Sequence, residues 1–170
     1  MPEPSRTEAP NATDWQPRIV AFFCTSCTYT AADLAGISRK KYASNVRIVR
    51  MPCTGRVDPQ FVLHAFAHGA DGVLIGGCHP GECQHVDGNH KAMRRHRLLL
   101  RLLESLGIQP DRFRLEWISA SEGGRLRRCI DEMVARVREL GPLALPSRFE
   151  TLDRETAPVP PAATEVSHAR

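Results

Sequence analysis

The chain lacks the features that mark several common functional classes. None of its apolar runs approaches the roughly 18 residues that a membrane span needs. No G-x-G-x-x-G lies between a strand-like and a helix-like segment, so no motif supports a bound dinucleotide. Aromatic residues make up only 6% of the sequence and do not interleave with the basic ones, and zinc-finger spacing is absent. Nucleic-acid binding is therefore not expected.

The sequence also has no recognisable export signal. Its opening, MPEPSRTEAPNATDW, is polar and lacks the basic and apolar regions of a secretory signal. In the reducing cytoplasm, clustered cysteines more often bind metal or catalyse than form structural disulfides. We therefore expect a cytoplasmic protein whose thiols are reduced or bound to metal.

The length and the composition fit one folded domain between two flexible ends. The chain has 170 residues, of which 42% are hydrophobic and 25% charged, as in ordinary globular proteins. Residues 1–16 are polar, and residues 143–170 are rich in proline and alanine without a clear period. We predict a flexible N-terminal segment at 1–16, a folded domain at 17–142 and a flexible tail at 143–170.

Strand and helix signals alternate within the folded domain. Strands are predicted at residues 18–23, 46–51, 72–77 and 113–118. Each is followed by a helix-compatible stretch, and in the long third helix we expect Leu99, Leu102, Leu103 and Leu106 to face the core. The alternation predicts an α/β fold, a flavodoxin-like or Rossmann-like three-layer sandwich with a four-stranded parallel sheet in the order 2-1-3-4.

Five of the six cysteines come just after the ends of three predicted strands. They are Cys24 and Cys27 after RIVAFF, Cys53 after VRIVRMP, and Cys78 and Cys83 after GVLIGG. Because the carboxyl ends of parallel strands meet at one edge of a sheet, these thiols can share one pocket. Five thiols there indicate a metal site, an iron–sulfur site or redox chemistry. The sixth, Cys129, lies on the apolar stripe of the last helix and is expected to be a buried core thiol.

The cysteines alone leave three kinds of site open. A [2Fe–2S] cluster needs four thiolates, so one of the five would be spare. Structural zinc would accept four of the same sulfurs, which would make the protein a zinc-stabilised interaction module. The C-x-x-C pair of Cys24 and Cys27 could instead serve a cytoplasmic dithiol oxidoreductase.

Three residues near the cysteines are candidates for contact with a cofactor. Gly76 and Gly77 end the third predicted strand. Glycine there permits close approach of the backbone, and the backbone amides can then hydrogen-bond to cluster sulfurs. Arg56 follows Cys53 and could offset the negative charge of a thiolate-bound cluster. We predict no catalytic residue.

Four segments together resemble a known family. FFCTSCTYTAADLAG, RIVRMPCTGRVDP, GADGVLIGGCHPGECQHVDGN and EWISASEG, in that order and spacing, are similar to the delta subunit of methyl-viologen-reducing hydrogenase, over about residues 17–142. The resemblance implies a small electron-transfer protein with a [2Fe–2S] cluster. Its metal ligands would be four of Cys24, Cys27, Cys53, Cys78 and Cys83.

The resemblance also implies partners. The protein would pass electrons between a hydrogenase or formate dehydrogenase module and an FAD-containing, heterodisulfide reductase A-like flavoprotein. It would be an electron-transfer subunit of an oxidoreductase complex rather than a catalytic subunit by itself. Partner contact is expected near the cysteine edge, around the loop at 78–89.

Overall fold

The computed structural model describes residues 15–143 and residue 145 of the chain. The flexible segments expected at 1–16 and 143–170 lie almost wholly outside the described residues. Among the described residues, Trp15 packs against the core and Leu145 is buried in it.

Four parallel strands form one sheet. The strands are β1 (Ile19–Cys24), β2 (Val46–Met51), β3 (Gly72–Gly77) and β4 (Phe113–Trp117). Their order is β2-β1-β3-β4, and all three neighbouring pairs are parallel. The predicted α/β class, the four-stranded parallel sheet and the strand order are therefore confirmed. β1 and β3 are central and almost entirely buried, which explains why they read as continuous apolar or glycine runs.

A helix follows each strand. The helices are α1 (Thr30–Ile37), α2 (Pro59–Ala67), α3 (Gly88–Ser105) and α4 (Gly123–Leu140). α2 begins where Asp58 accepts a hydrogen bond of 2.9 Å from the Gln60 N–H and Pro59 takes the first helical position, as the sequence pattern indicates. Three short helical turns join the elements: η1 (Thr25–Tyr29, a π-helical turn), η2 (Thr54–Arg56) and η3 (Pro110–Arg112).

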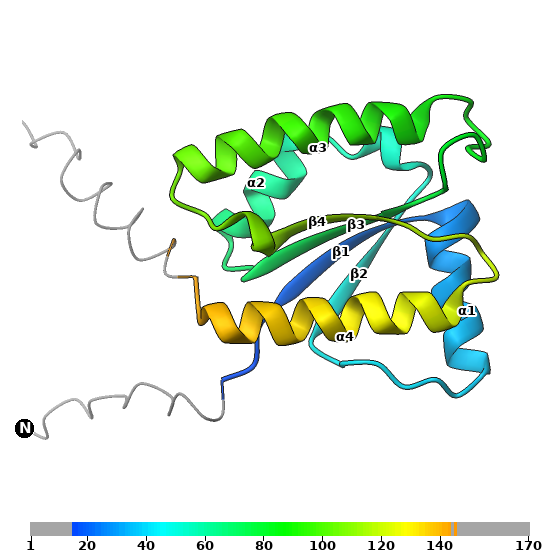
Figure 1. The fold of residues 1–170 in the computed structure, drawn as a ribbon, viewed down its shortest axis with the longest axis horizontal. Helices are drawn as coiled ribbons and strands as arrows, with labels where there is room; N and C mark the ends of the chain where they lie inside the picture. The colour runs from blue at the N-terminus through cyan, green and yellow to red at the C-terminus, as the bar shows by residue number, and fades with distance from the viewer. Residues whose placement is uncertain (1–14, 144, 146–170) are drawn as a thin grey trace, which may run out of the picture.

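The helices form two layers, one on each face of the sheet. α2 and α3 cover one face, and α1 and α4 cover the other (Figure 1). Successive residues of a strand point to opposite faces, so Phe22 packs under α2 and α3 whereas Phe23 packs under α1 and α4. Each face thus has its own apolar core.

The long helix α3 buries a narrower stripe than predicted. Leu99 and Leu103, one helical turn apart, are buried in the core. Leu102 and Leu106 are 41% and 45% exposed, so the expectation that they face inward was wrong. A helix that lies on the outside of a sheet buries one stripe, and these two leucines lie at its solvent edge.

The amino edge of the sheet is closed by a buried arginine. Arg112 is 1% exposed and donates hydrogen bonds to the backbone oxygens of Asp71, Leu140 and Gly141. The Asp71 carboxylate accepts hydrogen bonds from the backbone N–H groups of Arg18 and Leu143. These polar groups satisfy one another's hydrogen-bonding needs and hold the end of α4. This edge of the sheet is therefore structural, whereas the cysteines lie at the opposite edge.

No helix among the described residues is both long enough and apolar enough to cross a membrane.

Candidate metal centre

The first two cysteines of the site come from the end of β1 and the turn after it. Cys24 is the last residue of β1, and the chain winds directly into the π-helical turn η1. This wide turn carries Cys27 into the interior, where it is 5% exposed. Single π-helical turns are rare and are frequently found at functional sites.

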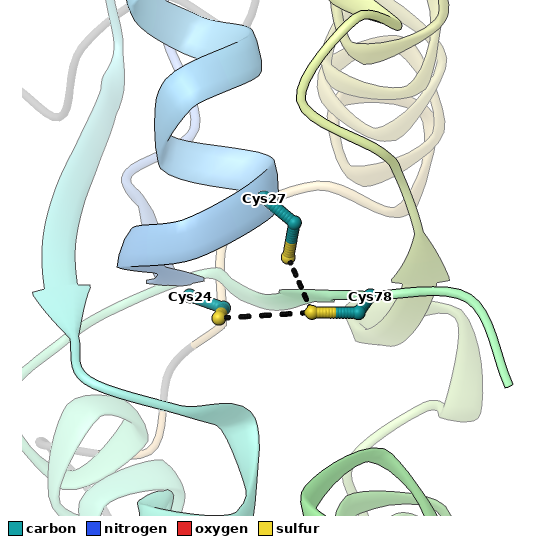
Figure 2. A group of neighbouring side chains, drawn as sticks. All are labelled: Cys24, Cys27 and Cys78. Atoms are coloured by element: carbon teal, nitrogen blue, oxygen red, sulfur yellow. Dashed lines mark hydrogen bonds between the residues drawn. The ribbon is translucent and has the colours of Figure 1, made fainter. Parts of the chain in front are cut away.

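Cys78, directly after β3, completes a buried triad with Cys24 and Cys27. The Cys78 thiol donates to Cys27 Sγ at 3.1 Å and lies 4.0 Å from Cys24 Sγ, and all three sulfurs lie within 4.8 Å of one another. Figure 2 shows the three side chains pointing at a common point between η1 and the end of β3. Two sulfurs bound to one metal at about 2.3 Å in tetrahedral geometry are roughly 3.8 Å apart, so the triad has the spacing of a metal site.

Cys53 and Cys83 form a second group of thiols. Their sulfurs are 3.8 Å apart, and the Cys53 sulfur also accepts a hydrogen bond of 3.4 Å from the Gly55 N–H. Cys53 precedes η2, and Cys83 lies in the loop that leads to α3. The structure therefore arranges the five predicted ligands as a triad and a pair.

Two glycines allow the loops of this pair to touch. A Cβ on Gly55 would lie 2.8 Å from the Gly88 Cα, and a Cβ on Gly88 would overlap Cys53 Sγ and lie 3.2 Å from Cys83 Sγ. Arg95 of α3 fixes the same contact, since its Nη1 donates to the backbone oxygens of Gly55 at 2.6 Å and Val57 at 3.1 Å. The Cys53 loop is thus held against the first turn of α3.

The triad and the pair share one edge of the sheet. Cys24 Sγ lies 3.7 Å from the Pro52 backbone oxygen, directly beside Cys53. Burial raises the pKa of Cys53, and negative charge on Cys83 and on Cys24 raises it further. Burial likewise raises the pKa of Cys78 to about 11, and charge on Cys24 and Cys83 adds to the shift. Thiols that hinder one another's ionisation in this way become thiolates together when a cation supplies the opposite charge.

Within the triad, negative charge concentrates on one sulfur. A hydrogen bond from Cys27 lowers the pKa of Cys24 to about 5, against the effect of burial. Donating that hydrogen bond, together with burial, raises the pKa of Cys27. Without metal the triad therefore holds one thiolate, which is a starting point for metal binding because thiolates, not thiols, are metal ligands.

The start of α3 favours ionisation of Cys83. Burial opposes its ionisation, but hydrogen bonds from the backbone amides of His85, Asn89 and Gly88 and from the Cys53 thiol outweigh burial and lower its pKa. Unpaired N–H groups at the start of a helix favour negative charge. Of the five thiols, Cys83 alone is partly exposed, and the other four are buried.

Two residues that the sequence analysis did not single out hold the Cys78 loop. Asn89, which is 1% exposed, donates to the backbone oxygens of His79 at 2.7 Å and Cys78 at 3.4 Å. Glu122 contacts His79 Nε2 at 2.8 Å and accepts a hydrogen bond from the Ser119 N–H at 2.7 Å. Both residues lie in segments that carry the family resemblance, and that resemblance was the sequence signal that could have identified them. Their contacts could not be read from the sequence, because they join loops that are distant along the chain.

The predicted cofactor-contacting residues have clear positions. Gly76 and Gly77 end β3, and a Cβ on Gly77 would lie 2.8 Å from Thr54 Cγ2, while one on Gly76 would overlap Thr28. Their lack of a side chain lets η1 and η2 pack on the strand. Arg56 is exposed and, with Cys53, lines a hollow of about 310 Å³. Contact between these residues and a cofactor stays a prediction.

Cys129 lies apart from the site. It is 6% exposed and packs in the core under α1 and α4 with Ile130 and Met133. The prediction of a buried core thiol is confirmed.

The fold and the site together define a class of protein. It is an α/β protein with a parallel sheet whose carboxyl edge carries a cysteine-rich site able to hold a metal. Residues 19–141 match the family described as methyl-viologen-reducing hydrogenase, delta subunit, and the chain belongs to that family.

Known relatives are D-type subunits of hydrogenases. The chain is 52% identical over 129 residues to the F420-non-reducing hydrogenase iron-sulfur subunit of Archaeoglobus profundus, covering 76% of this chain and 94% of the relative. It is 44% identical over 142 residues to the F420-non-reducing hydrogenase vhc iron-sulfur subunit of Methanococcus voltae, covering 84% and 99%. The similarity therefore spans nearly the whole of both relatives.

A different relative contains the matching segment within a much longer chain. It is the A-type subunit of the ferredoxin/F(420)H(2)-dependent CoB-CoM heterodisulfide reductase of Methanosarcina acetivorans, 46% identical over 127 residues. The alignment covers 75% of this chain but 16% of that relative. The same domain thus occurs both as a small chain and as part of a heterodisulfide reductase.

Proposed function

We propose that the protein is an electron-transfer subunit whose strand-end cysteines hold a [2Fe–2S] cluster. The observation that carries the proposal is the convergence of five thiols, as a triad and a pair, at one edge of the sheet. Four thiolates are the ligand set of such a cluster, so the donors present fit it. Relatives named as iron-sulfur subunits support the same assignment.

Four of the five thiols would bind the cluster, and the surrounding residues would set its properties. When bound, the cluster supplies one-electron oxidation and reduction. The sheet holds the sulfurs in place, and burial of four of the five excludes water. The backbone amides of His85, Gly88 and Asn89 stabilise negative charge on Cys83, and Arg56 would offset the charge of the thiolates.

The proposed partners follow from the relatives. The protein would pass electrons between a hydrogenase or formate dehydrogenase module and an FAD-containing, heterodisulfide reductase A-like flavoprotein. Hydrogenase subunits among the relatives support the first part. The presence of the same domain inside the A-type subunits of heterodisulfide reductases supports the second, because a domain fused to a protein works beside it. The reduced thiols that this function needs support a cytoplasmic location.

Spectroscopy of anaerobically purified protein tests the proposal. Ultraviolet–visible and electron paramagnetic resonance spectra are recorded before and after dithionite, and iron and sulfide are counted. We expect about two irons per chain, visible absorption that bleaches on reduction, and a one-electron paramagnetic signal. A colourless protein without iron after anaerobic reconstitution would refute the cluster.

A zinc-stabilised interaction module is the second candidate, because three cysteine sulfurs within 4.8 Å of one another also suit a single zinc ion. Zinc would give no colour and no redox signal, and a zinc assay would detect it. A dithiol oxidoreductase is less well supported by the geometry. A nucleophilic thiol must be reached by its substrate, whereas Cys24 and Cys27 are 1% and 5% exposed.

A further inference from the structure

An apolar groove lies beside the cysteine edge, where α2 leaves part of the sheet uncovered. The groove has a volume of about 520 Å³ and is lined from the sheet and from α2 by Val20, Phe22, Val49, Met51, Phe61, His64 and Ala65. Val49 is 40% exposed and Phe61 is 45% exposed. Apolar side chains that gather in a hollow on the surface mark an interaction site more often than scattered ones do.

A second hollow, beside Cys53, begins one residue after the groove along the chain. Met51 lines the groove, and the next residue, Pro52, lines the hollow of about 310 Å³ together with Cys53, Arg56, Asp87 and Lys91. The two depressions are thus lined by consecutive residues, Met51 and Pro52, and we name them together the β2 surface. A partner seated on it would lie directly beside Cys53, a candidate metal ligand.

Positive charge lies at both ends of the β2 surface. Arg47 is exposed and, by the alternation of a strand, is on the same face as Val49 and Met51. Arg56 is exposed at the other end. Neither arginine forms an ion pair with any residue that the structure describes, whereas Lys91 is paired with Asp87 at 3.1 Å. Within the part of the chain that the structure describes, the surface thus presents guanidinium groups without ion-pair partners around an apolar centre.

These charges select the kind of partner. A second copy of this chain would bring arginine against arginine, which disfavours self-association through this surface. An acidic segment would neutralise both ends. Guanidinium groups bind carboxylates with two parallel hydrogen bonds, and an apolar side chain in the groove would supply the desolvated anchor that protein interfaces use.

We propose that the β2 surface docks an acidic segment of a partner protein, with an apolar side chain in the groove and carboxylates at Arg47 and Arg56. That the partner exchanges electrons with this chain rests on the proposed function, whereas the docking itself rests on the groove and its charges. The contact would bring the partner to Cys53 and to His85 and Asp87 of the loop at 78–89, which line the same hollow, so it includes the region where the sequence analysis expected a partner. An electron would then pass at the Cys53 side of the site.

Photo-crosslinking in cells of the source organism tests the docking. Val49 is replaced by p-benzoylphenylalanine in the full chain, and Ile37, an apolar residue at the end of α1 that is 82% exposed, is replaced in a control chain. After illumination, the crosslinked peptide is sequenced by mass spectrometry. We expect position 49 to crosslink to a segment of another protein that contains an apolar residue and at least two carboxylates, and position 37 not to do so.

Charge reversal supplies the second readout. Arg47→Glu should lower the crosslink yield at position 49 at least tenfold, whereas Arg128→Glu, exposed on α4, should leave it unchanged. A crosslink to a second copy, to lipid or to a segment without carboxylates overturns the proposal, as does an equal yield in both variants. Absence of any crosslink at position 49, repeated with the probe at Phe61, overturns it as well.

Iron in the same purified samples separates the two proposals. A chain that crosslinks as expected but contains no iron would refute the cluster and leave the docking surface in place. A chain with two irons and no crosslink at position 49 or 61 would refute the docking surface and leave the cluster. Circular dichroism of each variant confirms that it is folded.

Discussion

A single methyl group at residue 88 should disrupt the candidate metal centre. Gly88 is the first residue of α3, and an alanine Cβ there would overlap Cys53 Sγ and lie 3.2 Å from Cys83 Sγ. Ordinary carbon contacts need about 3.5–4.0 Å, so the sulfur or its loop must retreat by on the order of 1 Å. Metal–ligand distances tolerate only about 0.2 Å, so a cluster that uses Cys53 cannot keep it as a ligand.

The energetic effect of Gly88→Ala can be separated from helix propensity. Replacing glycine by alanine inside a helix stabilises it by about 1 kcal/mol, whereas forcing an extra group into a packed site costs about 1–3 kcal/mol. Gly36 of α1 is the matched control, because nothing lies within 4 Å of a Cβ built there. We expect Gly36→Ala to be neutral or stabilising and Gly88→Ala to be destabilising by up to about 2 kcal/mol.

The assay compares iron per chain and the visible spectrum of the two variants after anaerobic reconstitution, with urea denaturation of the metal-free forms. We expect Gly88→Ala to hold less than about half of the wild-type iron, because one ligand is displaced. Gly36→Ala should hold the full amount. If Gly88→Ala binds iron as the wild type does and shows the same spectrum, close packing of Gly88 on the pair does not position a metal ligand.

Three further predictions address individual groups. Cys78→Ser should abolish iron binding, since Cys78 contacts both other sulfurs of the triad. Cys129→Ser should leave the iron content per chain, measured by elemental analysis, unchanged. Equal iron in the two variants would contradict the site. In reduced, metal-free protein at pH 7, Cys83 should be alkylated by iodoacetamide before Cys27, because hydrogen bonds lower its pKa and it is partly exposed; the reverse order in timed mass spectrometry would refute this. Hydrogen bonds from the neighbouring imidazole and from a backbone N–H lower the pKa of Glu122, so its stabilising effect should be complete above pH 4.5 and lost as the pH falls through its folded pKa. Glu122→Gln should therefore lower the melting temperature at pH 7 but not at a pH below that folded pKa, and an equal loss at both would refute the ionic contribution.

The architecture could be predicted from the sequence because strand and helix patterns alternate along it. Continuous apolar runs such as residues 72–77 predicted buried parallel strands, and the positions of the cysteines after them predicted a shared edge. The division into triad and pair was not predictable, since it depends on the π-helical winding of η1 and on the contact between Gly55 and Gly88. The exposure of Leu102 was missed because periodicity shows that a face is apolar but not how much of it another layer covers.

The strand order explains why a site forms at this edge. β1 and β3 are neighbours, but the helix after β1 lies on one face of the sheet and the helix after β3 lies on the other (Figure 1). The loops therefore separate above the two strands, and such a point is where open α/β sheets bind ligands. Cys24 and Cys27 enter this crevice from β1, Cys78 and Cys83 enter it from β3, and Cys53 closes it from β2.

The apolar core is built without the five thiols, and this indicates what role the thiols have. The apolar clusters on the two faces contain none of them, and Cys24, Cys27 and Cys78 form a small cluster of their own. In a small zinc module the metal replaces a core that the chain cannot build, so that the apo form is unfolded. Here the sheet already has a core on both faces and brings the sulfurs together itself. A group of thiols that the fold positions but does not need for stability is better explained by chemistry at the metal than by structural zinc.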